Sequence, residues 1–418
     1  MSQLEVDKVI PQSGTTLTLG DSADTITIPS GATLDATNAT VTYPAGSITD
    51  AAISSTAAIQ QSKISGSPGF RNMIINGDMS IAQRGTSTAG ITGSNVFVVD
   101  RWRIDEGADS TLTMSQENTS GLPYESGFKK SLKVLVTTAD ATLASNQSVQ
   151  LMQTIEAQNL QYLNFGSSTA KDLVLSFYYK SNVTGVHTLC IDKPDTTRTT
   201  CPLEFTVSLA DTWQKFTLNI NANSIVRDPS AVIDNDNGAG FRVMWGLAYG
   251  TDYTSGTNGI WEQNGTAAFS TSNQQNIVGT LSNYIEITGV QLEAGTTASD
   301  FEFLPVDVNL ARCYRYFQKH FKTNSEAILA GFRSTSVVHY PLKFFTTMRT
   351  TPSFSVLGLT ANNLTDGSNT TVSDATQQNA GTCNDTIWIA GTMTSSAGTV
   401  GGTAVVYGAN GLEVSSEL

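Results

Sequence analysis

The chain of 418 residues is poor in charged side chains, which make up only 14% of it instead of the roughly 25% of an ordinary soluble domain. Acidic residues outnumber basic ones by 36 to 23, which gives a formal net charge of -13. Because a negative surface repels phosphate backbones and no basic stripe is visible, we expect no nucleic acid partner. No run of about 18 apolar residues occurs, so we expect no membrane insertion. The first ten residues contain no secretory signal pattern, so we expect synthesis in the cytoplasm.

Cysteine and histidine are too few for most of the sites that these residues build. The 4 Cys contain no Cys-x-x-Cys pair, and only Cys190 and Cys201 lie near each other in the sequence. They flank a turn-rich stretch and could face each other across a hairpin, so a disulfide between them is an open alternative. No zinc spacing, Gly-x-Ser-x-Gly elbow or Gly-rich phosphate loop occurs. We therefore predict no catalytic residue, no metal site and no cofactor, and we interpret His187, His320 and His339 as strand or connector residues.

The missing charge is replaced by Thr, Ser, Asn and 35 Gly, a composition typical of all-β proteins. Branched side chains fit a pleated surface, while Gly and Asn supply turns. The length allows two or three domains at about 150 residues each. We predict an all-β fold with an N-terminal extended β stalk over residues 1–70 and a central antiparallel jelly-roll β-sandwich over 71–304. A connector over 305–325 and a small C-terminal β domain over 326–418 complete the chain.

The first 70 residues have a pattern of their own. Short alternating segments at 15–20, 24–29 and 39–44 each end in Gly or Pro. Four isoleucines follow at positions 48, 53, 59 and 64, a spacing that fits neither a helix nor a strand. We predict an extended stalk whose narrow apolar rows need neighbouring chains. A flexible Ser/Thr linker is the alternative.

The predicted sandwich contains strand candidates separated by clusters of Gly, Asn, Asp and Thr. Alternation is clear in Phe216, Leu218 and Ile220, where every second residue is apolar. Many strands without a helical run between them favour an antiparallel sandwich over a βαβ fold. The candidates are 131–138, 172–181, 213–220, 241–250 and 283–293.

The segment from residue 306 to residue 321 breaks the β pattern. Leu310, Tyr314 and Phe317 fall on one face at helical spacing, and Asp307 is a candidate N-cap, so we predict a short helix. Strands are then expected at 327–334, 336–345, 353–358, 386–391 and 403–408. The Thr/Asn-rich stretch over 359–384 shows no period and is predicted as a surface loop.

Two polar segments invite a functional interpretation. Residues 234–238, Asp-Asn-Asp-Asn-Gly, could supply oxygen ligands to a cation, but the spacing does not match an EF-hand loop and no Glu closes it. We interpret them as a turn in which Asn and Gly take left-handed backbone angles. Sugar binding instead needs exposed aromatic faces beside amides and carboxylates. Trp261 lies in a polar Gly-rich stretch near Tyr249 and Tyr253, and these three are the predicted carbohydrate-binding residues.

Each of these aromatic predictions has an alternative. Trp261 would merely anchor its loop against the sandwich if its ring is buried. The other four tryptophans are predicted to be core residues because they lie within or beside apolar runs; they are Trp102, Trp213, Trp245 and Trp388.

Two motifs bracket the predicted sandwich: FRNMIINGDMSIAQRGTS (70–87) with VVDRW (98–102), and ITGVQLEAGTTASDFEFLP (287–305). A third motif couples ARCYRYFQ (311–318) to PLKFFTTMRTTPSFSV (341–356). Taken together and in this order, they resemble the tail-fibre and tail-tip proteins of bacteriophages, especially those of marine phages. The bracketing motifs look like the opening and closing strands of a carbohydrate-binding-module-like β-sandwich in such fibres. The start, over 20–34, also looks like their N-terminal segments.

The resemblance implies a virion protein, trimeric as most fibres of this kind are, with the N-terminal segment bound to other tail proteins. The implied function is attachment to a host cell-surface glycan, without catalysis. A head fibre or decoration protein without a receptor is the first alternative, and a glycan depolymerase is the second. The sandwich motif in such modules usually reads Asn-Gly-Asp-Phe-Glu and helps to hold calcium. Here Ser80 replaces the acidic residue, so the resemblance does not extend to a calcium site.

Overall fold

The structure, a computed structural model, describes residues 70–321, 326–378, 386–396, 398, 400–408 and 411–418, together with positions 27, 30, 31 and 33. The chain divides into two compact units, Met1–Ser67 and Pro68–Leu418. The predicted stalk lies outside the described residues, apart from these isolated positions and residue 70. The account below therefore concerns the second unit.

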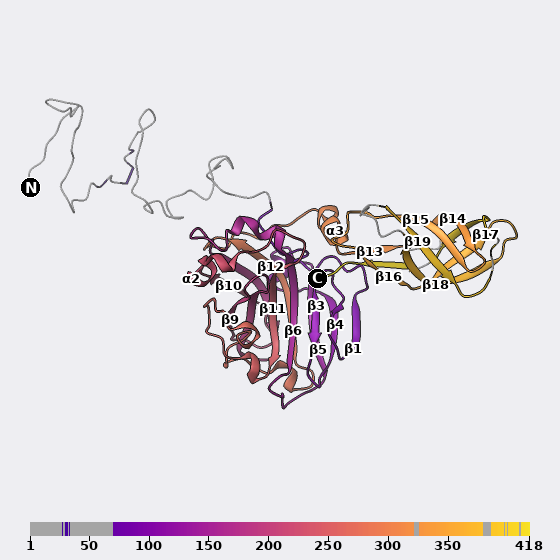
Figure 1. The fold of residues 1–418 in the computed structure, drawn as a ribbon. Helices are drawn as coiled ribbons and strands as arrows, with labels where there is room; N and C mark the ends of the chain where they lie inside the picture. Colours follow the sequence, from indigo (N-terminus) through magenta and orange to yellow (C-terminus); the bar gives the residue numbers. More distant parts are fainter. Residues whose placement is uncertain are drawn as a thin grey trace, which may run out of the picture. The chain divides into compact units, whose positions relative to one another are not determined.

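The second unit is almost entirely β structure, as Figure 1 shows, and this confirms the predicted fold class. Its described part contains two six-stranded antiparallel sheets, a three-stranded sheet and a closed six-stranded barrel. The helices are short: α1 (Leu122–Glu125), α2 (Ser224–Arg227) and α3 (Val306–Tyr314), with 3-10 turns such as η3 (Ala157–Leu163). No described helix is both long and apolar enough to cross a membrane.

The two six-stranded sheets form the sandwich, and each predicted strand of this region is present. The first sheet contains, in spatial order, β1 (Ser87–Ile91), β4 (Thr111–Asn118), β5 (Lys130–Thr138), β12 (Tyr284–Ala294), β7 (Leu173–Ser181) and β10 (Gln214–Ile220). The second contains β2 (Val96–Phe97), β3 (Arg103–Glu106), β6 (Ser148–Glu156), β11 (Ala239–Tyr249), β8 (Gly185–Lys193) and β9 (Thr199–Val207).

Large aromatic side chains fill the space between the two sheets. Trp245 of β11 lies 5.6 Å from the Trp102 ring and 5.5 Å from the Phe177 ring, measured between centroids. Trp102, Trp245 and Trp213 are buried, which confirms their prediction as core residues, although Trp213 packs with Phe128 and Tyr178 in a separate cluster. Successive side chains of a strand point to opposite faces, so the alternating pattern places one apolar set between the sheets.

The hairpin of β8 and β9 settles the question of the two neighbouring cysteines. Cys190 pairs with Pro202, and Cys201 pairs with Ile191, so the two cysteines are offset by one position across the ladder. A one-residue offset places side chains on opposite faces of a sheet. Both thiols are free and buried, and no disulfide joins them.

The predicted helix after the sandwich is shorter than expected. It ends at Tyr314, and Phe317 begins the strand β13 (Phe317–His320). Pairing with β21 (Leu412–Ser415), which in turn pairs with β16 (Ser353–Val356), overrides the helical spacing. The residue at the helix N-cap is Pro305 rather than Asp307, and it makes no side-chain capping bond.

The last lobe is a closed barrel. Its strands are, in spatial order, β14 (Ala327–Ser334), β15 (Val337–Lys343), β19 (Thr386–Met393), β18 (Asn369–Gln378), β17 (Leu359–Asn363) and β20 (Thr403–Tyr407). The prediction of a surface loop over 359–384 is wrong for β17 and β18. Buried Ala361 and Val372 alternate with polar neighbours there, but such small apolar side chains give a weak period in the sequence.

Trp388 of the barrel also differs from its prediction as a core residue. Its neighbour Ile389 is buried, whereas Trp388 is 52% exposed. Because strand residues alternate between faces, an inward Ile389 requires an outward Trp388. Membership of an apolar run therefore did not determine which residue of TIWIAG faces the core.

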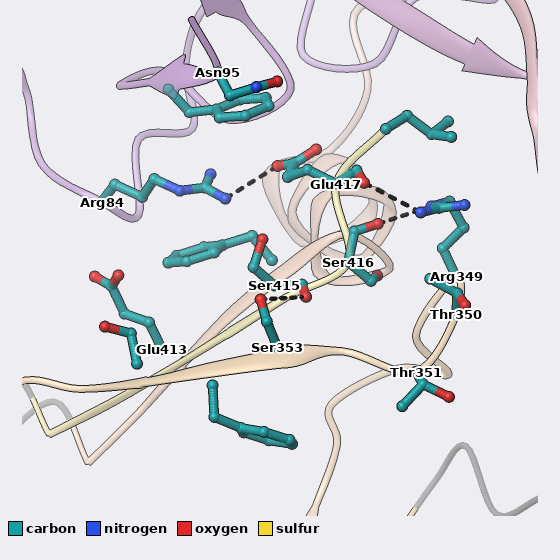
Figure 2. Close-up of a pocket in the computed structure, with 15 residues that line it drawn as sticks. Arg84, Asn95, Arg349, Thr350, Thr351, Ser353, Glu413, Ser415, Ser416 and Glu417 are labelled. Carbon is teal, nitrogen blue, oxygen red and sulfur yellow. Dashed lines mark hydrogen bonds and ion pairs between the residues drawn. The ribbon is translucent and has the colours of Figure 1, made fainter. Parts of the chain in front are cut away.

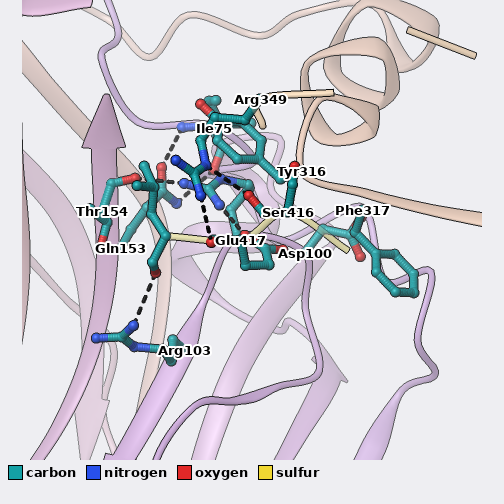
Figure 3. A network of polar contacts seen from close by, with 12 residues as sticks. Ile75, Asp100, Arg103, Gln153, Thr154, Tyr316, Phe317, Arg349, Ser416 and Glu417 are labelled. Carbon is teal, nitrogen blue, oxygen red and sulfur yellow. Dashed lines mark hydrogen bonds and ion pairs between the residues drawn. The ribbon is translucent and has the colours of Figure 1, made fainter. Parts of the chain in front are cut away.

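A buried arginine, Arg101, joins the sandwich to the last residues of the chain. Figure 3 shows its surroundings, with Thr154, Tyr316 and Glu417 labelled. Arg101 forms an ion pair with Glu417, and its Nη2 donates to the main-chain oxygen of Thr154 at 2.6 Å. The guanidinium lies 3.4 Å from the centroid of the Tyr316 ring. Arg349 donates to the main-chain oxygen of Glu417 at 3.1 Å. A buried cation needs a partner, and Glu417 supplies it across more than 300 residues of sequence.

Candidate functional site

The structure does not expose the tryptophan predicted to bind sugar. Trp261 is 1% exposed and packs edge-on against Phe165 at 5.5 Å, with Phe241 at 6.2 Å. Its main-chain oxygen accepts a hydrogen bond from Asn223 at 2.9 Å. The alternative interpretation, in which Trp261 anchors its loop, fits this position. A buried ring cannot stack on a sugar, which corrects the expectation that this residue is exposed.

The two predicted tyrosines lie together but apart from Trp261. Tyr249 is buried and Tyr253 is half-buried, and both belong to a cluster with Phe269 on the outer face of the second sheet. Tyr253 stacks on Phe269 with 6.0 Å between ring centroids. The hydroxyl of Tyr249 donates to Gln150 at 2.7 Å, and that of Tyr253 donates to the main chain of Asn146 at 3.1 Å. Both hydroxyls therefore already form hydrogen bonds within the protein.

The histidines lie in strands, as predicted. His187 is in β8, His320 in β13 and His339 in β15. His187 is buried between the Tyr179 hydroxyl and the main-chain oxygen of Val183, each at 2.9 Å. Burial lowers the pKa of His187 to about 4, so this ring is neutral at physiological pH.

The acidic segment 234–238 is a turn, but not of the predicted kind. Asp236 accepts a hydrogen bond from the Gly238 main-chain nitrogen at 2.8 Å, and no residue of the segment has a positive φ. The side chain therefore holds the turn without left-handed angles. In the described part of the chain, no group of three or more His, Cys, Asp or Glu side chains is placed to hold a metal ion.

The polar side chains of residues 76–80, which resemble the calcium-binding motif of sugar-binding modules, form hydrogen bonds within the protein. Asn76 donates to the main-chain oxygens of Ile81 and Asp100 at 2.9 and 3.0 Å. Asn309 of α3 donates to the Asp78 carboxylate at 3.2 Å and to the Ser80 hydroxyl at 3.3 Å. The side-chain amide of Asn309 thus contacts Asp78 and Ser80, the two side chains at the positions where a calcium ligand would be expected.

An aromatic cleft opens on the outer face of the first sheet. It has a volume of about 340 Å³, within the usual size of pockets for small ligands. Tyr178 and Ser176 of β7 line it. Phe128, Phe301 and Phe303 line it as well, and these three residues come from the two loops that flank the sheet. We call this hollow the aromatic cleft.

The rings of the aromatic cleft pack against one another through Phe128. Its ring centroid lies 4.8 Å from that of Phe301, 4.9 Å from that of Phe303 and 5.3 Å from that of Tyr178. Phe128 is buried, whereas Phe303 is 52% exposed. The cluster therefore combines a fixed buried ring with one ring face that reaches solvent.

A glycine in β12 makes room for these rings. Gly289 has φ of +63°, and a Cβ atom there would lie 2.8 Å from Phe128 and 3.0 Å from Tyr178. It sits at a register irregularity between Thr288 and Gln291. Only glycine takes this backbone angle freely and leaves the space open.

Polar groups surround the aromatic wall. The Tyr178 hydroxyl donates to Ser126 at 3.0 Å, and the Lys215 amine lies 5.8 Å from the Tyr178 ring centroid. Lys215 and Asp300 are both exposed, and neither forms an ion pair within the described residues. The cleft thus offers an amine, a carboxylate and hydroxyls beside apolar ring faces.

The sequence interpretation missed this cleft because its residues come from four distant segments. One signal was present. In β7, Leu175 and Phe177 mark the inward phase, so Tyr178 is an aromatic residue at an outward position. An aromatic residue at an outward position beside Ser176 and Lys180 indicates either a covering loop or a ligand.

A larger hollow of about 540 Å³ lies beside the last residues of the chain (Figure 2). Arg84 reaches Glu417 at 3.2 Å and lies between the rings of Phe97 and Phe317, at 4.9 and 3.6 Å from their centroids. Arg349 donates to the main chain of Ser416 at 2.8 Å. Both cations hold the end of the chain, Arg84 through an ion pair and Arg349 through hydrogen bonds to main-chain oxygens.

The comparisons with known proteins name no family for this chain. No protein-family model matches it, and no curated protein matches it either. Solved structures of carbohydrate-binding modules are similar. A family 4 module is 16% identical and covers 53% of this chain and 98% of its own length, with a TM-score of 0.26.

Two further modules carry sugars in their structures. The family 11 module of Clostridium thermocellum, in complex with a β-1,3-1,4-mixed-linked tetrasaccharide, is 12% identical over 52% of this chain and 100% of its own, with a TM-score of 0.25. A family 61 module in complex with β-1,4-galactotriose is 10% identical over 54% and 100%, with a TM-score of 0.25. Similarity at this level of identity and superposition establishes neither a shared family nor a shared ligand.

Proposed function

We propose that the chain is a glycan-binding structural protein of a phage particle, a tail-fibre component that attaches to the host surface and has no catalytic activity. The aromatic cleft is the observation that carries the glycan-binding part. It combines ring faces with unpaired polar groups, and that is the combination a pyranose requires. The phage part is supported by the motifs at 70–87 and 287–305, which resemble those of tail fibres.

A sugar ring has an apolar side and a belt of hydroxyls. Aromatic faces remove the apolar side from water, while amines, carboxylates and hydroxyls replace the water bound to the belt. In the aromatic cleft, the exposed Phe303 provides the ring face, and Lys215 and Asp300 provide the polar contacts. Three copies of one weak site on a fibre would bind a cell surface through avidity.

Glycan retention by cleft variants tests this assignment. We expect Phe303→Ala to weaken binding of host polysaccharide by about two- to tenfold per site, since an aromatic contact contributes about 0.5–1.5 kcal/mol. Phe303 is 52% exposed, so its removal leaves most of the core intact. Leu281→Ala, which removes another exposed apolar side chain from a loop, is the matched control and should bind as wild type.

The predicted tyrosines enter the same experiment as a rival site. Tyr253→Ala should retain full binding if the aromatic cleft is the site. Loss of binding in Tyr253→Ala together with normal binding in Phe303→Ala would transfer the site to the outer face of the second sheet. A wild-type chain that is not retained on host cells or their glycans would refute glycan binding altogether.

The virion part of the proposal has separate tests. Immunogold labelling of intact particles should place the chain on the tail, and labelling of the capsid would support the head-fibre or decoration alternative. Sedimentation of the full chain should give a homotrimer, and a stable monomer would contradict the fibre. The depolymerase alternative predicts new reducing ends when the chain is incubated with host polysaccharide, whereas our proposal predicts none.

A further inference from the structure

A second cleft beside α3 contains an arginine that lacks an acidic partner. The cleft has a volume of about 390 Å³, and it shares Asn72 and Arg312 with a smaller hollow that Phe301 also lines. Phe70, Tyr162 and Val308 contribute apolar or aromatic surface, and Arg312 and Arg315 contribute positive charge. We call this hollow the arginine cleft.

The two arginines of this cleft differ in what they contact. Arg315 binds Glu156 through Nε and Nη2, both at 2.7 Å, in a two-pronged ion pair. Arg312 donates through Nη2 to the main-chain oxygen of Asn72 at 3.3 Å and forms no ion pair within the described residues. One guanidinium in the cleft is therefore neutralised, and the other is not.

Glu302 is the carboxylate that acts electrostatically on Arg312, and it already accepts hydrogen bonds from the main chain. Glu302 accepts hydrogen bonds from the main-chain nitrogens of Arg71 and Asn72, each at 3.0 Å, through a single oxygen. The pKa values agree with this contrast. Burial lowers the pKa of Arg312, although Cys313, Tyr316 and Glu302 act to raise it. Hydrogen bonding to Glu156 raises the pKa of Arg315.

Aromatic surface lies beside the unpaired guanidinium. The Arg312 guanidinium is 5.9 Å from the centroid of the Phe70 ring, and Phe70 is 59% exposed. Tyr162 is half-buried and lines the same cleft. A ligand held here would have an anionic group at Arg312 and an apolar face against these rings.

We propose that the arginine cleft is a second binding site that takes the carboxylate of an acidic sugar, with the sugar ring resting against Phe70 and Tyr162. A guanidinium presents parallel N–H groups that match the two oxygens of a carboxylate. The choice of a sugar as the body of the ligand rests on the proposed glycan-binding function. The choice of a carboxylate rests on Arg312 itself.

The proposal is tested by equilibrium binding of two sugar probes to the full chain. Oligogalacturonate carries a carboxylate on each ring, and oligogalactose of equal length is neutral. We expect the acidic probe to bind at least about tenfold more tightly, and its affinity to fall with added salt. Equal affinity for both probes would overturn the proposal.

Arg312 variants then locate the site. Arg312→Gln should lose at least about tenfold in affinity for the acidic probe, and Arg312→Lys should recover only part because an ammonium lacks the fork. Arg227→Gln, which removes an exposed cation elsewhere on the sandwich, is the matched control for net charge. If Arg312→Gln bound oligogalacturonate with unchanged affinity, the proposed site would be refuted.

Phe70→Ala keeps the test decisive if Arg312→Gln does not fold, because Phe70 is largely exposed. This variant should bind the acidic probe less tightly, while its melting temperature stays near that of wild type. Phe303→Ala separates this proposal from the aromatic cleft. If Phe303→Ala abolishes acidic binding and Phe70→Ala does not, the second site is wrong and glycan binding by the first stands. Displacement of the probe by an acidic peptide at equal concentration would refute the sugar as ligand.

Discussion

The sandwich consists of two open antiparallel sheets and the C-terminal lobe is a closed antiparallel barrel, and their cores are built from different side chains. The sandwich core contains Trp102, Trp245 and Trp261 among its largest buried residues. The barrel strands contribute no buried tryptophan among their described residues, and their core mixes alanine and valine with a few larger side chains: Ala330, Ala361, Ala375, Ala404, Val338, Val372, Val406, Leu342, Leu359, Ile389, Met393, Phe332 and Tyr340. Large side chains leave a strong alternating pattern in the sequence, whereas Ala and Val among Thr and Ser leave a weak one. This difference explains why the barrel was harder to predict.

The comparison is tested most directly by removing one tryptophan from each lobe. Trp245→Ala should lower the free energy of unfolding by about 3–5 kcal/mol, because it leaves a cavity against Trp102 and Phe177. Trp388→Ala should cost less than about 1 kcal/mol, since that ring is 52% exposed. Urea unfolding of both variants measures the difference. Equal losses would mean that the barrel core depends on Trp388.

The ion pair that joins the lobes should have an effect of similar size. Glu417→Gln leaves the buried Arg101 without its carboxylate, and we expect a loss of about 3–5 kcal/mol, measured by urea unfolding. Glu413→Gln, two strand positions before Ser415, is the matched control. Its partner Lys319 is 3.7 Å away and partly exposed, so the loss should stay below about 1 kcal/mol. If both variants lost a similar free energy of unfolding, the buried pair of Arg101 and Glu417 would contribute no more to stability than the exposed pair of Lys319 and Glu413.

The buried histidine of the sandwich predicts a pH dependence that the barrel should not share to the same degree. The pKa of His187 falls to about 4 on folding, against 6.5 for the free side chain, because burial disfavours its charged form. The unfolded chain therefore binds the extra proton first as the pH falls. Stability is complete above about pH 6.5 and declines toward pH 4, by about 3 kcal/mol in total.

Substitution isolates this contribution. His187→Gln cannot titrate, so its loss of stability between pH 7 and pH 4 should be smaller than that of wild type, as measured by urea unfolding at both values. In the barrel, burial and the charge of Arg333 lower the pKa of His339 as well. That ring is only half-buried, so His339→Gln should change the pH dependence less. A larger effect at His339 would reverse the comparison.

The smallest expected effect concerns one glycine in each lobe. Gly289→Ala places a Cβ against Phe128 and Tyr178 at a positive φ, and we expect it to cost about 1–3 kcal/mol and to narrow the aromatic cleft. Gly331→Ala in β14 meets only a carbonyl oxygen 3.9 Å away, so it should be close to neutral. Thermal unfolding and glycan retention measure the two consequences. Normal stability and binding in Gly289→Ala would show that the cleft tolerates a side chain there.

Local pattern predicted five of the sandwich strands, β5, β7, β10, β11 and β12, because their core residues are large and alternate. Phe216 and Leu218 mark the buried phase of β10, and the register of β10 with β7 agrees with it. The end of α3 was not predictable in the same way. Phe317 has helical spacing from Leu310 and Tyr314, but it pairs with Ser415, almost 100 residues later in the chain. A contact so distant in sequence leaves no local signal.

The candidate sites show the same division. Tyr249 and Tyr253 were correctly expected to lie near each other, because only three residues separate them. Burial of Trp261 depends on Phe165 and Phe241, which no local pattern associates with it. The aromatic cleft combines Phe128, Tyr178 and two phenylalanines after residue 300, and only the folded sheets bring these together.

What the sequence determined by itself is the class of the molecule: low charge, abundant β-branched residues and alternating strands dictate antiparallel sheets. What only the tertiary structure decided is which aromatic residues are buried, which are exposed, and which arginine of the arginine cleft lacks an acidic partner. The physical reason is the distance along the sequence between the residues that interact. Strand formation depends on neighbours one or two positions away, whereas burial and ion pairing depend on residues that the fold brings in from hundreds of positions away, as Glu417 reaches Arg101.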